Sequence, residues 1–313
     1  IYNAWISFDD LALANQLSFY LLIFILGLFV LENLSRKKAQ YHSPTRGGFK
    51  KKSLTTLNGY KAFLAFSFCF LIFFISFLFP VLQMLYWTII FPKHLIDLDL
   101  ISLFSNTIIL VLLSSIVLIS FAFISNYGNR LSRSKFLEIL TTFSISGYAI
   151  PGIILAVAFI TFISWFDNNV ISFFDLKNVK SIFIGSILGL VIVYFVRFYS
   201  LASNGIKSGY LKISYSIDES AYLLGYSKFK TFKNIHIPYL KNTIMLIGIL
   251  IAIEIIKELP ITLIMRPFNF ETFATQAYIY ASQDLLEAAA APSLFLILIA
   301  SFFILITSRY ILK

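Results

Sequence analysis

The chain has 313 residues, of which 59% are hydrophobic, 18% are aromatic and only 13% are charged. Because a water-soluble domain carries about 25% charged residues, this composition excludes a soluble globular protein and indicates an integral membrane protein. The net charge of +10 therefore bears first on membrane sidedness rather than on nucleic-acid binding. The single cysteine, Cys69, excludes an internal disulfide framework and a cysteine-based metal site.

Seven apolar segments are long enough to cross a bilayer, which requires about 20 residues. The predicted spans, in chain order, are Leu17–Leu31, Ala62–Phe91, Phe104–Ile124, Ile139–Trp165, Ile182–Leu201, Thr243–Met265 and Leu294–Ile306. Pro80 interrupts the second span, and Pro151 with its neighbours Gly147 and Gly152 interrupts the fourth. Each interruption predicts either a simple kink or a broken helix that lines a pathway, because proline leaves a backbone carbonyl without its partner. The sequence thus predicts an all-α polytopic bundle of seven transmembrane helices.

Lys and Arg residues are concentrated in alternate loops of this arrangement. Most lie in the segments 33–61, 130–135 and 197–241 or at the C-terminus, whereas the opposite side receives Lys93, Lys177, Lys180, Lys257 and Arg266. Cytoplasmic loops carry an excess of basic residues, so we expect the first set to be cytoplasmic. The prediction is a multi-pass protein of a bacterial inner membrane, with residues 1–16 outside and the C-terminus in the cytoplasm.

The basic segment 33–61 contains few apolar residues and is predicted to be a cytoplasmic linker between two helical units. Residues 1–32 then hold the last transmembrane helix of an upstream unit. Residues 62–313 form a six-span unit with a long cytoplasmic loop at 202–241. Because the sequence begins at Ile1 and has no cleavable signal, we expect it to start inside a longer chain.

The loop 202–241 is predicted to contain a short helix that ends at a glycine. Ser216 or Asp218 can cap its start, and Gly225 can adopt the left-handed conformation that ends a helix. Helical spacing would place three small or apolar side chains on one face: Ile217, Ala221 and Leu224.

A second short helix is predicted to follow, with Ser227 as its cap and Pro238 as the residue that prevents its continuation. Such a helix pair suits docking into a groove of a soluble partner, or an amphipathic anchor that lies in the lipid interface. Spacing alone does not decide between these alternatives.

The same loop carries a set of residues at fixed spacing: Glu219, Ser220, Ala221, Leu224, Gly225, Ile235 and Pro238. This set resembles the Glu-Ala-Ala loop of binding-protein-dependent ABC importer permeases, although Ser220 replaces an alanine and Ile237 replaces a leucine. The resemblance implies that the loop is a coupling helix, which sits in a cleft of a cytoplasmic ATPase dimer. It also implies that ATP and Mg²⁺ are bound by that partner, and that this chain is not an enzyme and binds no cofactor.

Three further stretches, 147–152, 257–272 and 281–289, are similar to ferric-iron uptake permeases. Those permeases are usually single chains with two fused six-span halves, and the segment 35–43 resembles the junction between the halves. The resemblance therefore implies the second half of a ferric-iron permease, partnered by the other half, fused upstream or separate. Its outer loops, at 91–103, 167–180 and 266–292, would receive a periplasmic substrate-binding protein. A permease for thiamine, a polyamine or an anion is the alternative.

Residues near the helix breaks are candidates for a pathway or gate: Tyr148, Pro151, Glu258 and Pro260. Ionisable groups at membrane depth are costly and usually face a cavity or one another. The alternative for the charges of this region is an intrahelical pair at the interface, formed by Glu254 and Lys257 three residues apart.

The remaining polar residues carry weaker signals. Arg197 is expected to anchor the cytoplasmic end of the fifth span. The histidines, His42, His94 and His236, are expected in separate loops without metal-ligand spacing. An ion-driven secondary transporter or a membrane-embedded enzyme would need ionisable residues that converge at mid-membrane or near one face, so both are less favoured alternatives.

Overall fold

The computed structural model describes residues 1, 4, 8, 10–37, 56–132, 135–174 and 181–311. All regular elements in these ranges are helical, and seven helical stretches there are long and apolar enough to cross a membrane. These stretches are Leu11–Leu28, Tyr60–Ile90, Leu100–Ser132, Gly152–Phe173, Ile187–Tyr210, Lys228–Ile256 and Leu286–Ser308. The predicted all-α bundle with seven spans is confirmed.

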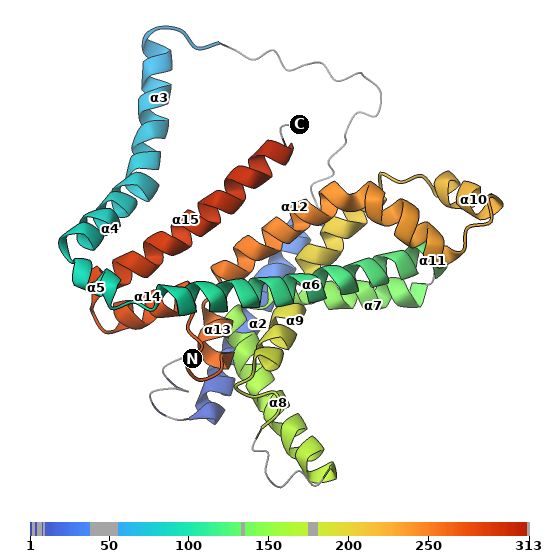
Figure 1. The fold of residues 1–313 in the computed structure, drawn as a ribbon, viewed down its shortest axis with the longest axis horizontal. Helices are drawn as coiled ribbons and strands as arrows, with labels where there is room; N and C mark the ends of the chain where they lie inside the picture. The colour runs from blue at the N-terminus through green and yellow to red at the C-terminus, as the bar shows by residue number, and fades with distance from the viewer. Residues whose placement is uncertain are drawn as a thin grey trace.

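Figure 1 shows the helices of the described chain, coloured in chain order. In chain order they are α2 (Leu11–Lys37), α3 (Tyr60–Phe73), η1 (Phe74–Leu78), α4 (Phe79–Ile90), α5 (Pro92–Ile96), α6 (Leu100–Ser132), α7 (Lys135–Ile145), η2 (Ser146–Ala149), α8 (Gly152–Phe173), α9 (Ile187–Tyr210), α10 (Tyr215–Leu223), α11 (Lys228–Thr231), η3 (Phe232–His236), α12 (Ile237–Ile256), α13 (Pro260–Met265), α14 (Phe273–Ser282) and α15 (Leu286–Ile311). Figure 1 shows α5 and α14 near the start of α6, and α10 and α11 near its end. The helix α6 therefore extends from one end of the bundle to the other.

The helix α9 forms the centre of the bundle and packs against α6, α8, α12 and α13. Its side chains Tyr194, Phe198 and Ile206 are completely buried, and they pack with Leu118 of α6 and Ile251 of α12. In contrast, α3 has no buried residue and stands apart from the other helices (Figure 1). Since lipid is as apolar as these side chains, close packing rather than removal from water holds the helices around α9 together.

Three membrane-crossing helices of the described chain contain a proline, and in two of them the proline follows a π-helical segment, whereas Pro292 lies inside α15. The segment η1 precedes Pro80, and the segment η3 precedes Pro238. Proline cannot donate a main-chain hydrogen bond and its ring clashes with the carbonyl four residues earlier, so a wider turn relieves both problems. The prediction that Pro238 ends a short helix is therefore wrong, because the helical stretch continues from Lys228 to Ile256.

The fourth and sixth spans differ from their predicted bounds because each is a broken helix. The segment predicted as Ile139–Trp165 consists of α7, the 3₁₀ turn η2 and α8, and only α8 is long enough to cross a membrane. Pro151 is the N-cap residue of α8. The segment predicted as Thr243–Met265 ends its long helix at Ile256, and the short helix α13 starts afresh at Pro260.

The helix α2 packs along α8. Ala14 is completely buried, and the side-chain amide of Asn15 donates a hydrogen bond to the hydroxyl of Thr161 at 3.3 Å. The assignment of residues 1–32 to an upstream unit stays a prediction. Most of the predicted linker 33–61 lies outside the described residues.

Candidate functional site

The helix α10 is capped at both ends. The hydroxyl of Ser214 accepts a hydrogen bond from the main-chain N–H of Ser216 at 3.3 Å, so the predicted cap at Ser216 or Asp218 is wrong. At the other end Gly225 has a φ of 80°, and its N–H donates to the carbonyl of Tyr222 at 3.0 Å. The predicted left-handed ending at Gly225 is confirmed.

The chain turns back into a second helix directly after Gly225. The hydroxyl of Ser227 accepts from the N–H of Lys230 at 3.3 Å and caps α11, as the sequence predicted. Ile235 is partly buried on this helix and Pro238 is exposed. The motif residues thus lie on α10, on the turn that follows it and on the first part of a membrane-crossing helix.

Large apolar side chains are exposed at the turn between α10 and α11. Leu223 is 89% exposed, Leu224 is 78% exposed and Phe229 is 72% exposed. The polar motif residues Glu219 and Ser220 are exposed beside them. These five residues are called the docking surface below, and Figure 1 shows that α10 projects at the end of the bundle.

The predicted apolar face of Ile217, Ala221 and Leu224 is only partly formed. Ala221 is buried against the bundle and Ile217 is partly buried, so both point inward. Leu224 is the first residue past the helix end, with a non-helical ψ of 7°, and it therefore leaves the helical spacing and points outward.

A buried polar cluster, which the sequence did not predict, lies behind this turn. The Nε atom of Arg130 lies 2.6 Å from Oδ2 of Asp218, and Nε2 of His236 lies 2.8 Å from Oδ1 of the same carboxylate. Arg130 belongs to α6, Asp218 to α10 and His236 to η3. These three residues are called the carboxylate cluster, and their wide separation in sequence hides the contact from any spacing rule.

Aromatic rings enclose the carboxylate cluster. The ring centroids of Tyr127 and Tyr210 lie 5.3 Å and 5.4 Å from that of His236. The hydroxyl of Tyr127 also donates to the carbonyl of Lys228 at 2.7 Å. His236 is completely buried within a helical segment, so its predicted position in a loop is wrong.

The second candidate site is an ion pair inside the helical bundle. The Nε atom of Arg197 lies 3.4 Å from Oε2 of Glu258, and Nη1 of Arg197 donates to the carbonyl of Ile150 at 2.5 Å. Arg197 lies in the interior of α9, so its predicted role as an anchor at the end of a span is wrong. The guanidinium instead joins two helix breaks, one before α8 and one before α13.

The four predicted pathway residues gather around this ion pair. Arg197 reaches Glu258 directly, and its guanidinium carbon lies 6.0 Å from the centre of the Tyr148 ring. Pro151 follows the carbonyl that Arg197 binds, and Pro260 begins the helix that follows Glu258. These five residues are called the gate cluster below.

Hydrogen bonds of the neighbouring residue Thr262 also hold Glu258 in place. The hydroxyl of Thr262 donates to the main-chain carbonyl of Glu258 at 2.7 Å and also hydrogen-bonds to the hydroxyl of the buried Tyr194. A Cβ atom on Gly152 would lie 2.5 Å from Oε1 of Glu258. Glycine at this position therefore leaves the space that the carboxylate occupies.

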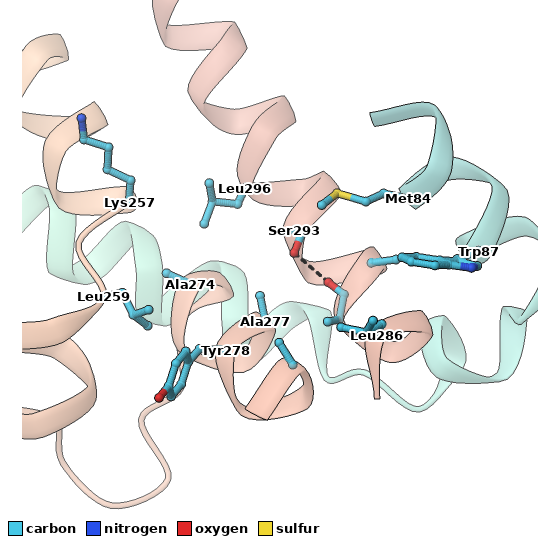
Figure 2. A pocket seen from close by; sticks show the side chains of 13 residues that line it. Met84, Trp87, Lys257, Leu259, Ala274, Ala277, Tyr278, Leu286, Ser293 and Leu296 are labelled. Atoms are coloured by element: carbon cyan, nitrogen blue, oxygen red, sulfur yellow. Dashed lines mark hydrogen bonds between the residues drawn. The ribbon is translucent and has the colours of Figure 1, made fainter. Parts of the chain in front are cut away.

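An apolar cavity of about 410 Å³ lies between α4, α14 and α15 (Figure 2). Met84, Trp87 and Leu296 line it together with several alanines, and Leu259 and Lys257 border it. Nζ of Lys257 lies 2.7 Å from Oε1 of Glu254, which confirms the predicted intrahelical pair. The lining of the cavity is mainly apolar, and it shares no residue with the gate cluster, although Lys257 and Leu259 flank Glu258 in the chain.

The predicted absence of metal-ligand spacing concerns three histidines. His94 lies in α5, His236 is engaged with Asp218, and His42 lies outside the described residues. Within the described part of the chain, no group of three or more His, Cys, Asp or Glu side chains is arranged to hold a metal ion. Cys69 is exposed on α3.

No family model matches the chain. The chain is 22% identical over 286 residues to the Fe(3+)-transport system permease protein FbpB 2 of Haemophilus influenzae. The alignment covers 88% of this chain and 53% of that protein, so the chain spans about half the length of the curated relative that it matches.

Two solved structures share the fold. One is a bacterial ABC transporter involved in the import of the acidic polysaccharide alginate, with a TM-score of 0.61 and 18% identity over 79% of this chain and 94% of that chain. The other is a bacterial alginate ABC transporter in complex with an alginate pentasaccharide-bound periplasmic protein, with a TM-score of 0.62 and 16% identity over 79% and 93%. The predicted resemblance to ABC importer permeases of the ferric-iron type is confirmed.

Proposed function

We propose that this chain is a transmembrane permease subunit of an ATP-driven, binding-protein-dependent ABC importer, and that its docking surface seats in the ATPase partner. The observation that carries this proposal is the capped, exposed turn, in which Leu223, Leu224 and Phe229 stand uncovered at the end of the bundle. Rigid apolar side chains on a short helix suit a groove on a soluble protein. The likenesses to a ferric-iron permease and to alginate importers support the same reading.

ATP and Mg²⁺ would be bound by the partner ATPase dimer, and this chain would bind no cofactor. Closure of the ATPase dimer would move the docking surface and rock the helices behind it. An amphipathic anchor in the lipid interface is the competing role for this turn. An anchor needs only an apolar face, whereas here Ser214, Gly225 and Ser227 fix the orientation of the turn.

We propose that the gate cluster opens and closes the transport pathway. Ionisable side chains inside a membrane are rare, and broken helices beside them often line the route of a solute. Arg197 and Glu258 belong to different segments, so relative movement of α9 and α13 would break or form their contact. Alternating access would then expose the pathway to each side of the membrane in turn.

Ferric iron is the proposed solute, on the support of the FbpB 2 protein, which matches along most of this chain. A periplasmic substrate-binding protein would deliver it to the outer loops at 91–103, 167–180 and 266–292, which contain α5 and α14. One structural neighbour is described in complex with a periplasmic protein. Another solute, such as thiamine, a polyamine or an anion, is the alternative within the same class.

The proposal places the protein in a bacterial inner membrane, with its C-terminus in the cytoplasm. Residues 1–32 would belong to an upstream permease half, residues 33–61 would be the cytoplasmic linker, and residues 62–313 would form the second half. The relative's length, about twice that of the matched region, supports two halves. Lipid surrounds the remaining apolar faces, and nucleic acid has no part in the proposal.

The docking role is tested by a pull-down of the complete transporter in detergent. Leu224→Asp places a charge on an exposed side chain, so the fold should be retained while the ATPase subunit is lost. Leu211→Asp is the matched control, because Leu211 is 81% exposed on the same loop but lies outside the docking surface. Equal ATPase recovery from both variants, or none with the wild type, would favour the anchor or a secondary transporter.

The solute is tested separately, in liposomes that contain the complete transporter. Import of radioactive ferric iron should require ATP and the iron-loaded binding protein. Import of thiamine, a polyamine or an anion in place of iron would retain the importer class and reject iron.

A further inference from the structure

We infer that the carboxylate cluster of Arg130, Asp218 and His236 is the mechanical link that passes movement of the docking surface to the helices that carry the gate cluster. The inference rests on the proposed function and deepens it, because it assigns positioning residues to the same coupling loop. Asp218 immediately precedes the exposed Glu219, yet it is only 7% exposed and points into the bundle. The same short helix therefore has one side for the partner and one side for the bundle.

Both oxygens of the Asp218 carboxylate are engaged. One is 2.6 Å from Nε of Arg130 and the other is 2.8 Å from Nε2 of His236. Hydrogen bonds to a charged carboxylate are short and strong, and breaking such a pair in a buried place leaves an uncompensated charge. Movement of α10 therefore carries α6 and η3 with it.

Arg130 makes a second set of contacts on the chain segment between α9 and α10. Its Nη1 and Nη2 atoms donate to the carbonyls of Ile213 and Ser214, each at 3.0 Å. Nη1 also lies 3.4 Å from the carbonyl of Tyr210, at the end of α9. The planar guanidinium can hold all of these acceptors with Asp218, which the single ammonium of a lysine cannot.

Two of the helices joined by the carboxylate cluster carry, or end close to, the two charged residues of the gate cluster. Arg197 lies on α9, whose end is bound by Arg130. His236 lies in the first part of the helical stretch Lys228–Ile256. This stretch ends two residues before Glu258. Helices transmit displacement along their length, so a shift at the carboxylate cluster changes the relative positions of Arg197 and Glu258.

The test uses the complete transporter with its ATPase, binding protein and other permease half, reconstituted in liposomes. Asp218→Asn removes the charge that holds the cluster and leaves the docking surface unchanged. We expect the variant to retain its ATPase subunit and to hydrolyse ATP, but to import at least tenfold less ferric iron per ATP. Arg130→Lys should also lower this ratio, whereas Asp218→Glu, which keeps the charge, should restore part of it.

A second readout requires no solute. Cys69→Ser removes the one cysteine of these 313 residues, and Tyr148→Cys then introduces a cysteine in the gate cluster. ATP with vanadate should change the rate at which a maleimide labels this cysteine, and Asp218→Asn should abolish that change. The measurement detects movement at the gate cluster even if the solute is not iron.

Asn126→Ala is the matched structural control. Asn126 lies one turn before Arg130 on α6, and its amide donates to the carbonyl and hydroxyl of Ser203 at 3.2 Å and 3.1 Å. The variant removes a buried link between α6 and α9 without touching the carboxylate cluster. It should lower the melting temperature but retain the wild-type ratio of import to hydrolysis and the wild-type labelling response.

Three results would overturn the inference. Wild-type labelling response in Asp218→Asn would show that the cluster transmits nothing. Loss of that response in Asn126→Ala as well would show a general structural effect. Loss of the ATPase subunit from Asp218→Asn would show that the cluster only shapes the docking surface. Failure of the proposed function is distinct, because the wild type would then neither retain an ATPase subunit nor respond to ATP.

Discussion

Arg197, in the interior of α9, forms an ion pair with Glu258, in the helix break before α13, with Nε 3.4 Å from Oε2. The side chain of Arg197 is 20% exposed and that of Glu258 is 9% exposed, so the pair is mostly buried. Charges inside a membrane are tolerated when they are paired. The pair therefore restrains how far α9 and α13 can separate in the conformation observed.

Glu258→Gln should destabilise the protein and disturb transport, because it leaves the Arg197 charge without its partner. Loss of one member of a buried pair costs about 3–5 kcal/mol, and partial exposure should reduce this to about 1–3 kcal/mol. We expect the apparent melting temperature in detergent to fall by several degrees. Glu254→Gln is the control, because its pair with the largely exposed Lys257 should contribute less than about 1 kcal/mol. Equal shifts in both variants would contradict a special role for the internal pair.

Gly152→Ala should displace the Glu258 carboxylate, because the added Cβ would lie 2.5 Å from Oε1. The expected outcome is a lower transport rate while the ATPase subunit is still retained. Gly128→Ala on α6 is the matched variant, since nothing lies within 4 Å of its added Cβ, and it should stabilise the helix by up to about 1 kcal/mol. Transport assays and thermal melts of the two variants check this contrast.

Gly225→Val should destabilise the turn between α10 and α11 that carries the docking surface. The φ of 80° is a left-handed conformation that a β-branched residue strongly disfavours. The strain amounts to about 1–2 kcal/mol or more, whereas Gly225→Asn should cost less because asparagine tolerates this region. Nothing lies within 4 Å of the added Cβ, so a steric clash is not the cause. ATPase recovery in a pull-down should fall in the order glycine, asparagine, valine, and the reverse order for the two variants would refute the conformational argument.

Asp167→Asn should loosen the segment that follows α8. The carboxylate of Asp167 is 2% exposed and accepts hydrogen bonds from the N–H groups of Ile182, Phe183 and Ile184 at 3.0–3.2 Å. Loss of about 1.4 kcal/mol of protection corresponds to tenfold faster exchange, so hydrogen–deuterium exchange of these amides should rise at least tenfold.

The control for that measurement is Asp284→Asn. Asp284 is exposed and has a φ of 60°, which asparagine also tolerates. Exchange near Ile182 should stay unchanged in this variant. Unchanged exchange in Asp167→Asn would mean that the carboxylate does not hold the segment.

Local rules predicted the end of α10 and the cap of α11, but not the start of α10, where Ser214 rather than Ser216 or Asp218 is the cap. Ser227 and Gly225 have the predicted roles, since a serine cap and a left-handed glycine act within one helical turn. The same rules were wrong for Pro238, where the π-helical segment η3 lets the helix continue. A proline rule considers one carbonyl clash, whereas a wider turn of the preceding residues removes that clash.

The sequence by itself determined the class of this protein: a helical membrane protein with seven spans, and a turn that ends at Gly225. Hydropathy, charge and cap chemistry add up along the chain, so they can be read without knowing which helices are neighbours. Only the tertiary structure decided that Asp218 joins Arg130 and His236, and that Arg197 reaches Glu258. Those contacts depend on how distant helices pack and rotate against each other, and no periodicity within a single helix encodes that relationship.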